Sequence, residues 1–350
     1  MNLVVLTLLV SLGSCMLIVM TRQLHGRFTF DHVQGVQKFH AGAVPRVGGI
    51  GLYVGLLVAY RVAGEQAAPV LEPLLVAGLP ALIAGLLEDT TRRVSVRARL
   101  GATLFSGMLI CWMTGQALTR LDVPLLDTLL QVPLLAVLFT AFAMAGLANA
   151  LNIIDGLNGL ASGVLTICTA TLGVLALQAG DTTLALTATL VAAATIGFWL
   201  VNFPFGKIFL GDGGAYFGGF ALAWLAVQLP LRNPDISPWI SLLVCAYPIV
   251  ETVYSILRRL AGHHSPGEPD AAHLHSLLMI RCTERVHPHW PRWAQHSLVS
   301  LPVWLLAGTP ALLAVQLANR SSGELALVFA AAFLAYHRVY RRVAASATAR

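Results

Sequence analysis

Long apolar stretches alternate with short polar segments along the whole sequence. A transmembrane helix needs about 20 mostly apolar residues, and windows of this kind recur from the first residues to the last. The first window lacks a basic start and a small-residue cleavage site, so we interpret it as a retained span rather than a signal peptide. We therefore expect an all-α fold, a polytopic membrane helical bundle. The pattern predicts eleven spans, the third of them the shortest, at residues 2–20, 48–64, 73–87, 100–117, 129–148, 160–179, 182–201, 214–230, 238–257, 297–317 and 323–340.

The composition favours the same fold class. Hydrophobic residues make up 57% of the 350 residues and charged residues only 11%, whereas soluble domains carry about 25% charged residues. A soluble enzyme with one membrane anchor is therefore excluded. Because no repeat, low-complexity tract or separate polar domain interrupts the pattern, residues 1–350 are expected to form a single integral membrane domain. The five cysteines fit neither a disulfide framework nor a zinc site and are interpreted as small apolar residues.

Basic residues are strongly biased toward one side of this arrangement. Cytoplasmic loops are enriched in lysine and arginine, so we expect the N-terminus outside and the C-terminus in the cytoplasm. All 11 histidines also fall on the predicted cytoplasmic side, which places the chemistry there, in loops near 21–47, 88–99, 149–160, 202–213 and 258–296. The net charge of +6 is first a topology signal and also suits anionic lipid or phosphorylated substrates; nothing resembles a nucleic-acid-binding module. Of the 22 lysines and arginines, the only ones on the opposite side are Arg61, Arg120, Arg232 and Arg320.

A polar cluster between the fifth and sixth windows carries the clearest candidate chemistry. Asn149, Asn152 and Asp155 recur every third residue, so the end of a helix would present them on one side. Asn158 follows, and the glycines beside it let the backbone turn and approach a ligand closely. Polar groups next to hydrocarbon usually line a site rather than face lipid.

Two further loops carry acids. Glu88 and Asp89 end the third window, where adjacent carboxylates can attract a divalent cation or divide the roles of metal contact and proton acceptor; a solvated helix end paired with basic neighbours is the alternative. Asp212 lies in a glycine-rich turn after Asn202. Free backbone N–H groups there suit an anion and the carboxylate suits Mg²⁺, although a plain turn before the eighth span remains open.

The first and fifth loops add basic and imidazole groups. Lys38, His40 and Arg46 stand beside a Pro/Gly turn that suits a phosphate-facing loop, although the positive-inside rule alone also explains them. His273 and His275 could bind zinc. Near a Mg²⁺ site they would instead contact phosphate, because Mg²⁺ prefers oxygen ligands. A polar loop without a site is the alternative.

Each signal is modest, but four loops on one predicted face combine carboxylates with phosphate-compatible groups. Bundled helices would bring them together, which points to Mg²⁺-assisted phosphoryl chemistry. This interpretation depends on the convergence of Asp89, Asp155 and Asp212 into one acidic pocket. Glu251, inside the ninth window and shortly before two arginines, is either a structural ion-pair partner or part of the cavity wall, and we favour the structural role.

These motifs resemble the polyprenyl-phosphate N-acetylhexosamine-1-phosphate transferase family, which also contains the phospho-N-acetylmuramoyl-pentapeptide transferases. The resemblance runs in order along most of the chain, from about residue 31 to residue 278. The segments that carry it are Lys38-x-His40 with Pro45-Arg46-x-Gly-Gly, Glu88-Asp89, Asn149 to Asn158, Phe209-x-Gly-Asp212 and His273-x-His275.

The resemblance implies a reaction. A sugar-1-phosphate moves from a UDP-N-acetylhexosamine, by default UDP-N-acetylglucosamine, to undecaprenyl phosphate, and UMP is released. It also implies Mg²⁺ as cofactor, with Mn²⁺ as a substitute, and it leaves a homodimer open. The site would face the cytoplasm at the bacterial inner membrane, among membrane lipids, and would start a surface glycan such as the O-antigen of lipopolysaccharide.

The resemblance further implies roles for single residues. Glu88, Asp89 and Asp212 would be catalytic, and Asp212 with Asn152 would hold the metal. Glu88 and Asn158 stand where the family commonly has aspartate, and Ser276 stands where it often has histidine. The residues implied in substrate binding are Lys38, His40, Arg46, Asn149, Asn152, Asp155, Asn158, Asn202, His273 and His275.

Two alternatives stay open. The peptidoglycan branch of the family is ranked lower, because it resembles a ten-span protein with three consecutive histidines, whereas this chain has eleven windows and His-x-His. A transporter of lipid-linked phosphates would also need intramembrane polar residues. The polar groups here gather on one predicted face, however, and alternating access would need a route to both.

Overall fold

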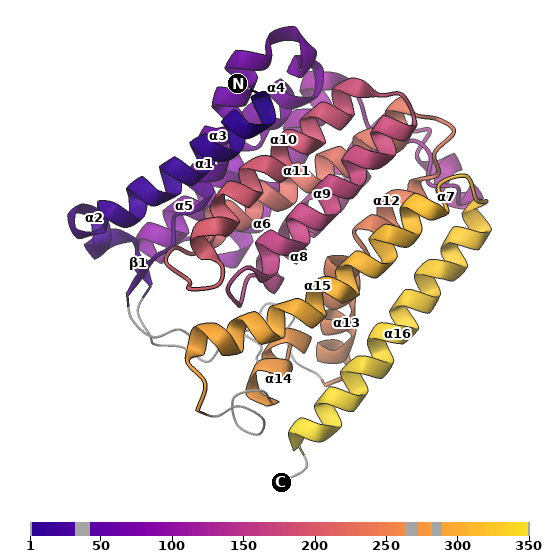
Figure 1. Cartoon of the computed structure of the whole chain (residues 1–350). Helices are drawn as coiled ribbons and strands as arrows, with labels where there is room; N and C mark the ends of the chain where they lie inside the picture. The colour runs from indigo at the N-terminus through magenta and orange to yellow at the C-terminus, as the bar shows by residue number, and fades with distance from the viewer. Residues whose placement is uncertain (1, 32–42, 263–271, 282–288, 349–350) are drawn as a thin grey trace.

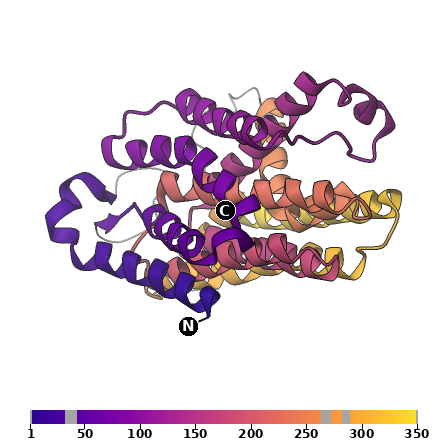
Figure 2. The ribbon, with the colours of Figure 1, turned by 90° about the horizontal axis from the view of Figure 1, so that it is seen from above.

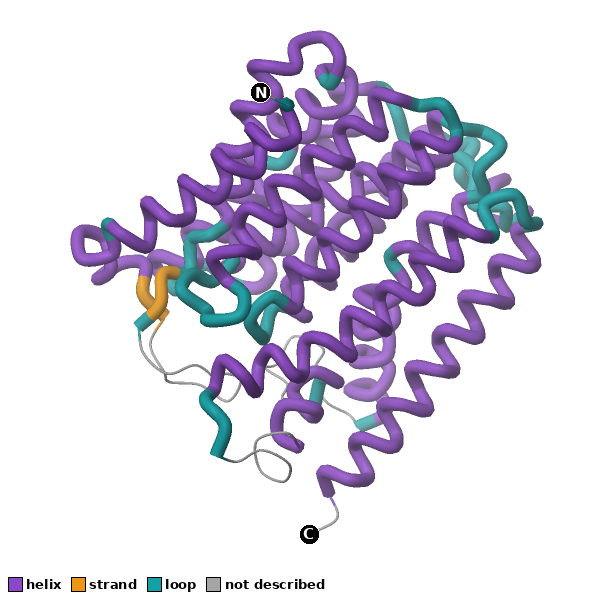
Figure 3. The backbone as a smooth tube through the Cα atoms, in the orientation of Figure 1, coloured by secondary structure: helices purple, strands orange, loops and turns teal. Residues whose placement is uncertain are grey.

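Nearly all of the described chain is helical. The computed structural model describes residues 2–31, 43–262, 272–281 and 289–348. Figure 3 shows helices throughout this part of the chain, with one short pair of strands. The prediction of an all-α membrane protein is confirmed at this level.

The elements follow one another with short connections. The helices are α1 (Leu3–Met20), α2 (Arg22–Thr29), α3 (Gly49–Ala63), α4 (Ala68–Ala77), α5 (Leu79–Thr91), α6 (Val96–Thr114), α7 (Pro124–Leu129), α8 (Pro133–Ile154), α9 (Leu160–Gln178), α10 (Thr182–Asn202), α11 (Gly211–Arg232), α12 (Pro238–Val244), α13 (Ala246–Ala261), α14 (Leu274–Arg281), α15 (Arg292–Gln316) and α16 (Ser322–Thr348). A 3-10 turn (Gly64–Gln66) follows α3, and the two strands are β1 (Phe30–Asp31) and β2 (Val44–Pro45).

The local sequence explains where several helices begin. Ser95 accepts a hydrogen bond from the Ala98 N–H at 3.2 Å at the start of α6, and Asp181 accepts from the Leu184 N–H at 3.0 Å at the start of α10. These side chains satisfy N–H groups that have no partner within the helix. Pro133 opens α8, where a missing N–H costs nothing.

Seven helices in the part of the chain that the structure describes are long and apolar enough to cross a membrane: α1, α4 with α5, α8, α9, α10, α11 and α15. The pair α12 and α13 adds an eighth if it counts as one span, although it bends by 79°. The remaining predicted windows overlap α3, α6 and α16. The chain is thus a multi-pass membrane protein, and the count of eleven spans stays a prediction.

The predicted span 238–257 is two helices rather than one. The break falls at Cys245, between α12 and α13. Pro248 follows three residues later, in the first turn of α13, where its ring and missing N–H are tolerated. A continuous helix through this point would place that proline in its interior and lose a backbone hydrogen bond.

Helix α11 is the centre of the bundle. Every residue from Gly211 to Pro230 is buried, and the helix packs against α3, α5, α8 and α9. The close approach of α5 depends on glycine, because a Cβ at Gly85 would overlap the backbone of Gly213. Small residues at such crossings allow membrane helices to pack backbone against backbone.

The periphery of the bundle is suited to lipid. Helix α1 lies at an edge in both views (Figure 1, Figure 2), and its exposed residues include Leu9, Met16 and Leu17. Helices α15 and α16 form the opposite flank in Figure 1. The two chain termini lie at opposite ends of the molecule (Figure 1).

A two-residue strand pair fixes the first loop against the start of α11. Strands β1 and β2 pair antiparallel, with Phe30 opposite Pro45. The Pro45 carbonyl accepts a hydrogen bond from the Phe209 N–H at 2.8 Å, and the Gly48 N–H donates to the Phe209 carbonyl at 3.0 Å. Arg46, between these two anchor points, is thereby held beside the first turn of α11.

Candidate active site

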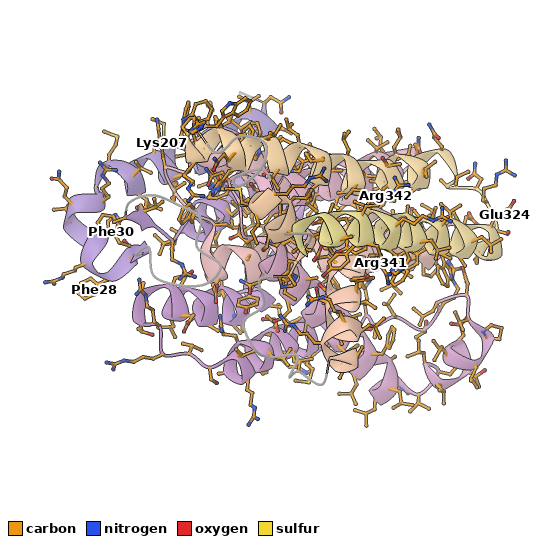
Figure 4. All side chains as sticks on the ribbon, turned by 90° about the horizontal axis from the view of Figure 1, so that it is seen from below. Phe28, Phe30, Lys207, Glu324, Arg341 and Arg342 are labelled. Atoms are coloured by element: carbon orange, nitrogen blue, oxygen red, sulfur yellow. The ribbon has the colours of Figure 1, made fainter. Side chains whose placement is uncertain are left out.

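Polar residues from several helices meet at one end of the bundle. Helices α5, α8 and α10 end there and α6 and α11 begin there, so Asp89 and Asp212 touch although they are 123 positions apart. Figure 4 marks this end by Phe30 and Lys207, opposite Glu324. The predicted loops 88–99, 149–160 and 202–213 therefore converge, and parts of the first and fifth loops join them. Lys38 and His40, predicted to bind substrate, lie outside the described residues.

Asp212 is the centre of the cluster. It lies in the first turn of α11 and is 8% exposed. Its Oδ1 accepts a hydrogen bond from Asn152 Nδ2 at 3.1 Å and another from Arg46 Nη2 at 3.4 Å. Its Oδ2 pairs with Arg99 Nη1. The two residues predicted to share a metal, Asp212 and Asn152, are therefore in contact.

Asp89 holds the start of α11 in place. Its Oδ1 and Oδ2 accept hydrogen bonds from the Asp212 and Gly213 N–H groups, both at 2.9 Å. Arg46 Nη2 lies 3.3 Å from Asp89 Oδ1, and the carboxylate is almost fully buried. A negative charge at a helix N-terminus is stabilised by the free N–H groups and the helix dipole. In this arrangement Asp89 orients Asp212; its predicted catalytic role stays a prediction.

Glu88 makes a different contact from Asp89, although its charge lies near enough to act on Arg99 of the cluster. Its Oε2 accepts a hydrogen bond from the Val94 N–H at 2.8 Å and so ties down the turn between α5 and α6. Adjacent residues on a helix point in different directions, so Glu88 and Asp89 do not form the single two-acid site that their adjacency suggests. A catalytic role for Glu88 stays a prediction.

Asp155 adds a third acid just beyond the end of α8. Removal from water raises the pKa of Asp155 to about 7, and the negative charges of Asp212 and Asp89 act in the same direction, whereas Arg46 acts against it. Asp89 and Asp212 are thus in direct contact, and Asp155 lies near enough for its charge to interact with both. Among the described residues, Arg46 and Arg99 are the arginines whose ion pairs with Asp89 or Asp212 are seen.

Arg99 is a site residue that sequence reasoning missed. Arg97 and Arg99 open the same helix, and both were used only as signals of topology. Arg97 is exposed, whereas the Arg99 side chain is 16% exposed and pairs with Asp212. One turn later, Thr103 Oγ1 accepts a hydrogen bond from Asn149 Nδ2 at 3.3 Å. Only the position of α6 against α8 and α11 distinguishes the two arginines.

Asn158 and Asn202, the two other amides predicted to bind substrate, hold two loops together. Asn158 Nδ2 donates to the Pro204 carbonyl at 2.9 Å. Asn202 Oδ1 accepts from the Gly159 N–H at 2.5 Å, and its Nδ2 donates to the Ile208 carbonyl at 2.6 Å. These bonds join the turn after α8 to the loop before α11. Contacts of Asn158 and Asn202 with a nucleotide stay predictions.

Helix α14 brings the His-x-His motif to the same turn. A Cβ at Gly156, next to Asp155, would lie 2.6 Å from His275 Nε2. His275 is 4% exposed, and its Nδ1 has no hydrogen-bond partner among the described residues. Burial lowers the pKa of His275 to about 4, with Glu251 acting against this and His273 adding to it. The ring is therefore neutral near pH 7.

Carboxylates and an amide next to each other are the donors that Mg²⁺ prefers. No three His, Cys, Asp or Glu side chains of the described residues form a group that could hold a metal alone. Mg²⁺ usually takes only one or two carboxylates and completes its shell with water and substrate phosphates. Burial is the main cause of the raised pKa of Asp155, and the charges of Asp212 and Asp89 add to it, so a bound cation would favour its ionised form. Asp155, Asp212 and Asn152 thus fit Mg²⁺ bound together with a phosphate ligand.

Comparisons with known proteins match a large part of the chain. The family described as glycosyl transferase family 4 matches residues 72–230. A probable undecaprenyl-phosphate N-acetylglucosaminyl 1-phosphate transferase of Bacillus subtilis is 29% identical over 247 residues, 69% of this chain and 68% of the relative. Undecaprenyl-phosphate alpha-N-acetylglucosaminyl 1-phosphate transferases of Yersinia pestis and Escherichia coli are 29% and 28% identical, each over 69% of this chain and 67% of the relative.

Proposed function

Because this chain is a relative of the undecaprenyl-phosphate N-acetylglucosaminyl 1-phosphate transferases and carries the glycosyl transferase family 4 segment, we propose that it transfers N-acetylglucosamine 1-phosphate from UDP-N-acetylglucosamine to undecaprenyl phosphate. The observation that carries this proposal is the convergence of Asp89, Asp155 and Asp212 with two arginines at one end of a membrane bundle. Such a site suits a charged diphosphate whose acceptor is anchored in lipid.

The reaction exchanges one phosphorus–oxygen bond for another. An oxygen of the lipid phosphate attacks the β-phosphorus of the nucleotide sugar, and the bond from this phosphorus to the bridging oxygen breaks. UMP leaves with the bridging oxygen. Enzymes accelerate phosphoryl transfer mainly by positioning the two phosphates and stabilising their charge.

The chain supplies groups for both tasks. Arg46 and Arg99, which neutralise Asp212 in the free protein, are the cations available to phosphate oxygens, and the planar guanidinium suits such contacts. His275 is neutral and has a free ring nitrogen among the described residues, so it would contact phosphate through a hydrogen bond rather than as a cation. Asp89 keeps Asp212 in position by holding the first turn of α11.

Mg²⁺ is part of the proposal. Asp212, Asp155 and the side-chain oxygen of Asn152 would hold it. When bound, Mg²⁺ would neutralise the diphosphate and favour the departure of UMP.

The membrane setting explains why one protein handles both substrates. The apolar surface keeps the prenyl tail in hydrocarbon, while the polar end of the bundle meets the soluble nucleotide. We place this end on the cytoplasmic side of a bacterial inner membrane, with the N-terminus outside, because lysine and arginine are enriched there.

The test is release of UMP by protein purified in detergent. We expect release only when UDP-N-acetylglucosamine, undecaprenyl phosphate and Mg²⁺ are all present. The Asp212→Asn variant should be slower by about 100-fold or more, since it loses a charge aimed at the reacting group. Asp235→Asn, in an exposed loop at the other end, is the matched control. Full activity of Asp212→Asn, or no UMP release by the wild type, would contradict the proposal.

The same assay separates the nucleotide donors. UDP-N-acetylmuramoyl-pentapeptide should give no UMP if the chain acts like the named relatives, and UMP if it acts in the peptidoglycan branch. Other UDP-N-acetylhexosamines tested beside UDP-N-acetylglucosamine would define the sugar. We propose that the product starts a lipid-linked surface glycan such as O-antigen, which loss of that glycan in a deletion strain would test.

A further inference from the structure

The C-terminal helix reaches the site through a buried acid. Glu251 of α13 is 0% exposed. Its Oε2 accepts a hydrogen bond from the Tyr336 hydroxyl of α16 at 2.7 Å and lies 3.5 Å from the Tyr247 hydroxyl. Its Oε1 lies 3.2 Å from His273 Nδ1 and accepts from the Leu274 N–H at 3.2 Å. One carboxylate thus connects α13, α16 and the start of α14.

A second contact from α16 holds the same segment. The Tyr340 hydroxyl donates to the Ala272 carbonyl at 2.9 Å, immediately before His273. Ser255 Oγ of α13 lies 3.1 Å from His273 Nδ1. The start of α14 is therefore fixed by side chains of two helices, and none of these groups faces the acid cluster around Asp212 directly.

The fixed segment presents the second histidine to the site. The rings of His273 and His275 stack, with centroids 5.6 Å apart and planes inclined by 7°. His275 is the member next to Gly156, and its Nδ1 has no hydrogen-bond partner among the described residues. A shift of the His273 ring would thus move His275 relative to Asp155.

We propose that Tyr336 is a positioning residue of the transfer site, which acts by fixing Glu251 and, through it, His273 and its stacked partner. Buried hydrogen-bond networks are rigid when fully satisfied and loosen when one member is removed. A group that contacts substrate needs such support to stay within a fraction of an ångström of its working position. Glu251, for which a structural role was favoured, thereby gains a role in substrate binding, and α16 becomes part of the enzyme rather than an accessory helix. This inference rests on the proposed function.

The test is a double-mutant cycle with a matched control. Tyr336→Phe removes one hydroxyl and should lower kcat/KM about tenfold, the effect of one hydrogen bond to a charged group. In the His273→Ala background the same change should lower it less than about twofold, because Glu251 then holds α14 only at the Leu274 N–H and no longer positions a ring stacked on His275.

Tyr254→Phe, the matched control, removes another hydroxyl between α13 and α16, which lies 3.2 Å from His337 Nδ1 rather than on Glu251. The Tyr254 ring packs against Tyr336 and Tyr340, and phenylalanine keeps that ring contact. Tyr254→Phe should stay within about twofold of its parent in both backgrounds.

Equal losses in both backgrounds would mean that Tyr336 acts independently of His273 and would overturn the proposal, as would no loss at all. If His273→Ala is too slow to assay, the affinity of each variant for UMP in the presence of Mg²⁺ replaces kcat/KM in the double-mutant cycle. Glu251 itself is a poor variant, because its removal leaves several buried donors unpaired.

Hydrogen exchange gives a readout that needs no activity. Tyr336→Phe should accelerate exchange of the α14 backbone (Leu274–Arg281) about tenfold, since it weakens a local contact, whereas Tyr254→Phe should not. Unchanged exchange in Tyr336→Phe overturns the positioning role even in an active enzyme. If Tyr336→Phe exchanges faster but the wild-type protein forms no UMP, the structural link from Tyr336 to α14 is supported and the proposed function is rejected.

Discussion

At the residue scale, the balance of charge around Asp212 decides what the site can bind. Two guanidinium groups and three carboxyl groups lie together, so the acids oppose a bare diphosphate while the arginines attract it. A cation bound with the diphosphate removes this opposition. This balance supports the proposal that the site binds a metal–diphosphate pair rather than either partner alone.

Arg99 provides a test of this balance. Arg99→Gln should lower the rate of UMP formation by roughly 10- to 100-fold, because a positive charge next to Asp212 and the proposed diphosphate is lost. Arg97→Gln changes an exposed arginine in the same turn and should stay within about twofold of wild type. Equal rates for the two variants would remove Arg99 from the site.

His275 makes stability depend on pH. Its pKa is about 4 in the folded protein against an ordinary value of 6.5, so the unfolded chain binds more protons between these values. Stability should therefore fall as pH falls from about 7 toward 4, by about 2 kcal/mol at pH 5. Thermal unfolding in detergent at pH 7.5 and pH 5 measures this. His275→Gln should show a smaller drop in Tm, and an identical drop would contradict the buried neutral ring.

At the element scale, the site depends on how closely α5 approaches α11. Asp89 reaches the Asp212 and Gly213 N–H groups only because Gly85 and Gly213 let the two backbones touch. Helix packing thus sets a hydrogen-bond geometry that in turn sets the position of the Asp212 carboxylate, the proposed metal ligand. The positive φ of 73° at Gly211 completes this turn, since residues with a Cβ rarely adopt it.

Gly85→Ala should disturb this crossing. The added methyl would overlap the Gly213 backbone, and overpacking of this kind typically costs about 1–3 kcal/mol. Activity should fall with stability, because Asp212 would move. Gly101→Ala in α6, where a Cβ meets nothing within 4 Å, should be neutral or slightly stabilising. Thermal unfolding and UMP release of both variants check this, and a Gly85→Ala protein like wild type would refute it.

At the scale of the whole molecule, the bundle has one chemical end and one connecting end. At the connecting end, Arg232 pairs with Asp181 at 2.5 Å, and both Ser237 and Ser322 donate to Asp122 at 2.6 Å. These polar groups satisfy one another and tie helix ends together. The candidate site residues were predicted to gather on one face, and in the described residues the acid cluster around Asp212 lies at one end of the bundle.

Cysteine labelling tests which end faces the cytoplasm. Cys15, Cys111, Cys168 and Cys245 are buried, so Cys282→Ser gives a suitable background. Arg93→Cys lies in the exposed α5–α6 turn at the chemical end, and Asp235→Cys lies in the exposed α11–α12 loop at the other end. A membrane-impermeant maleimide should label Asp235→Cys in intact spheroplasts, and Arg93→Cys only after the membrane is opened. Labelling of Arg93→Cys but not of Asp235→Cys in intact spheroplasts would contradict the predicted topology.

Much of the fold was predictable because its signals are local or additive. Apolar length predicts where helices lie, the lysine and arginine bias predicts which loops share a side, and the three-residue spacing of Asn149, Asn152 and Asp155 placed them at a helix end. Ordered motifs likewise indicated the acids Asp89 and Asp212. The break at Cys245 was not predicted, since hydropathy averages over it.

The sequence by itself determined that this is a helical membrane protein whose candidate chemistry lies in the loops of one predicted side. Only the tertiary structure decided what each group does there: Asp89 caps α11 while Glu88 caps a turn, Arg99 meets Asp212 while its near neighbour stays exposed, and Tyr336 reaches the histidines through Glu251. The reason is physical. Hydrophobic burial depends on composition along a segment, whereas a hydrogen bond or an ion pair depends on where another helix, far away in the chain, happens to pack.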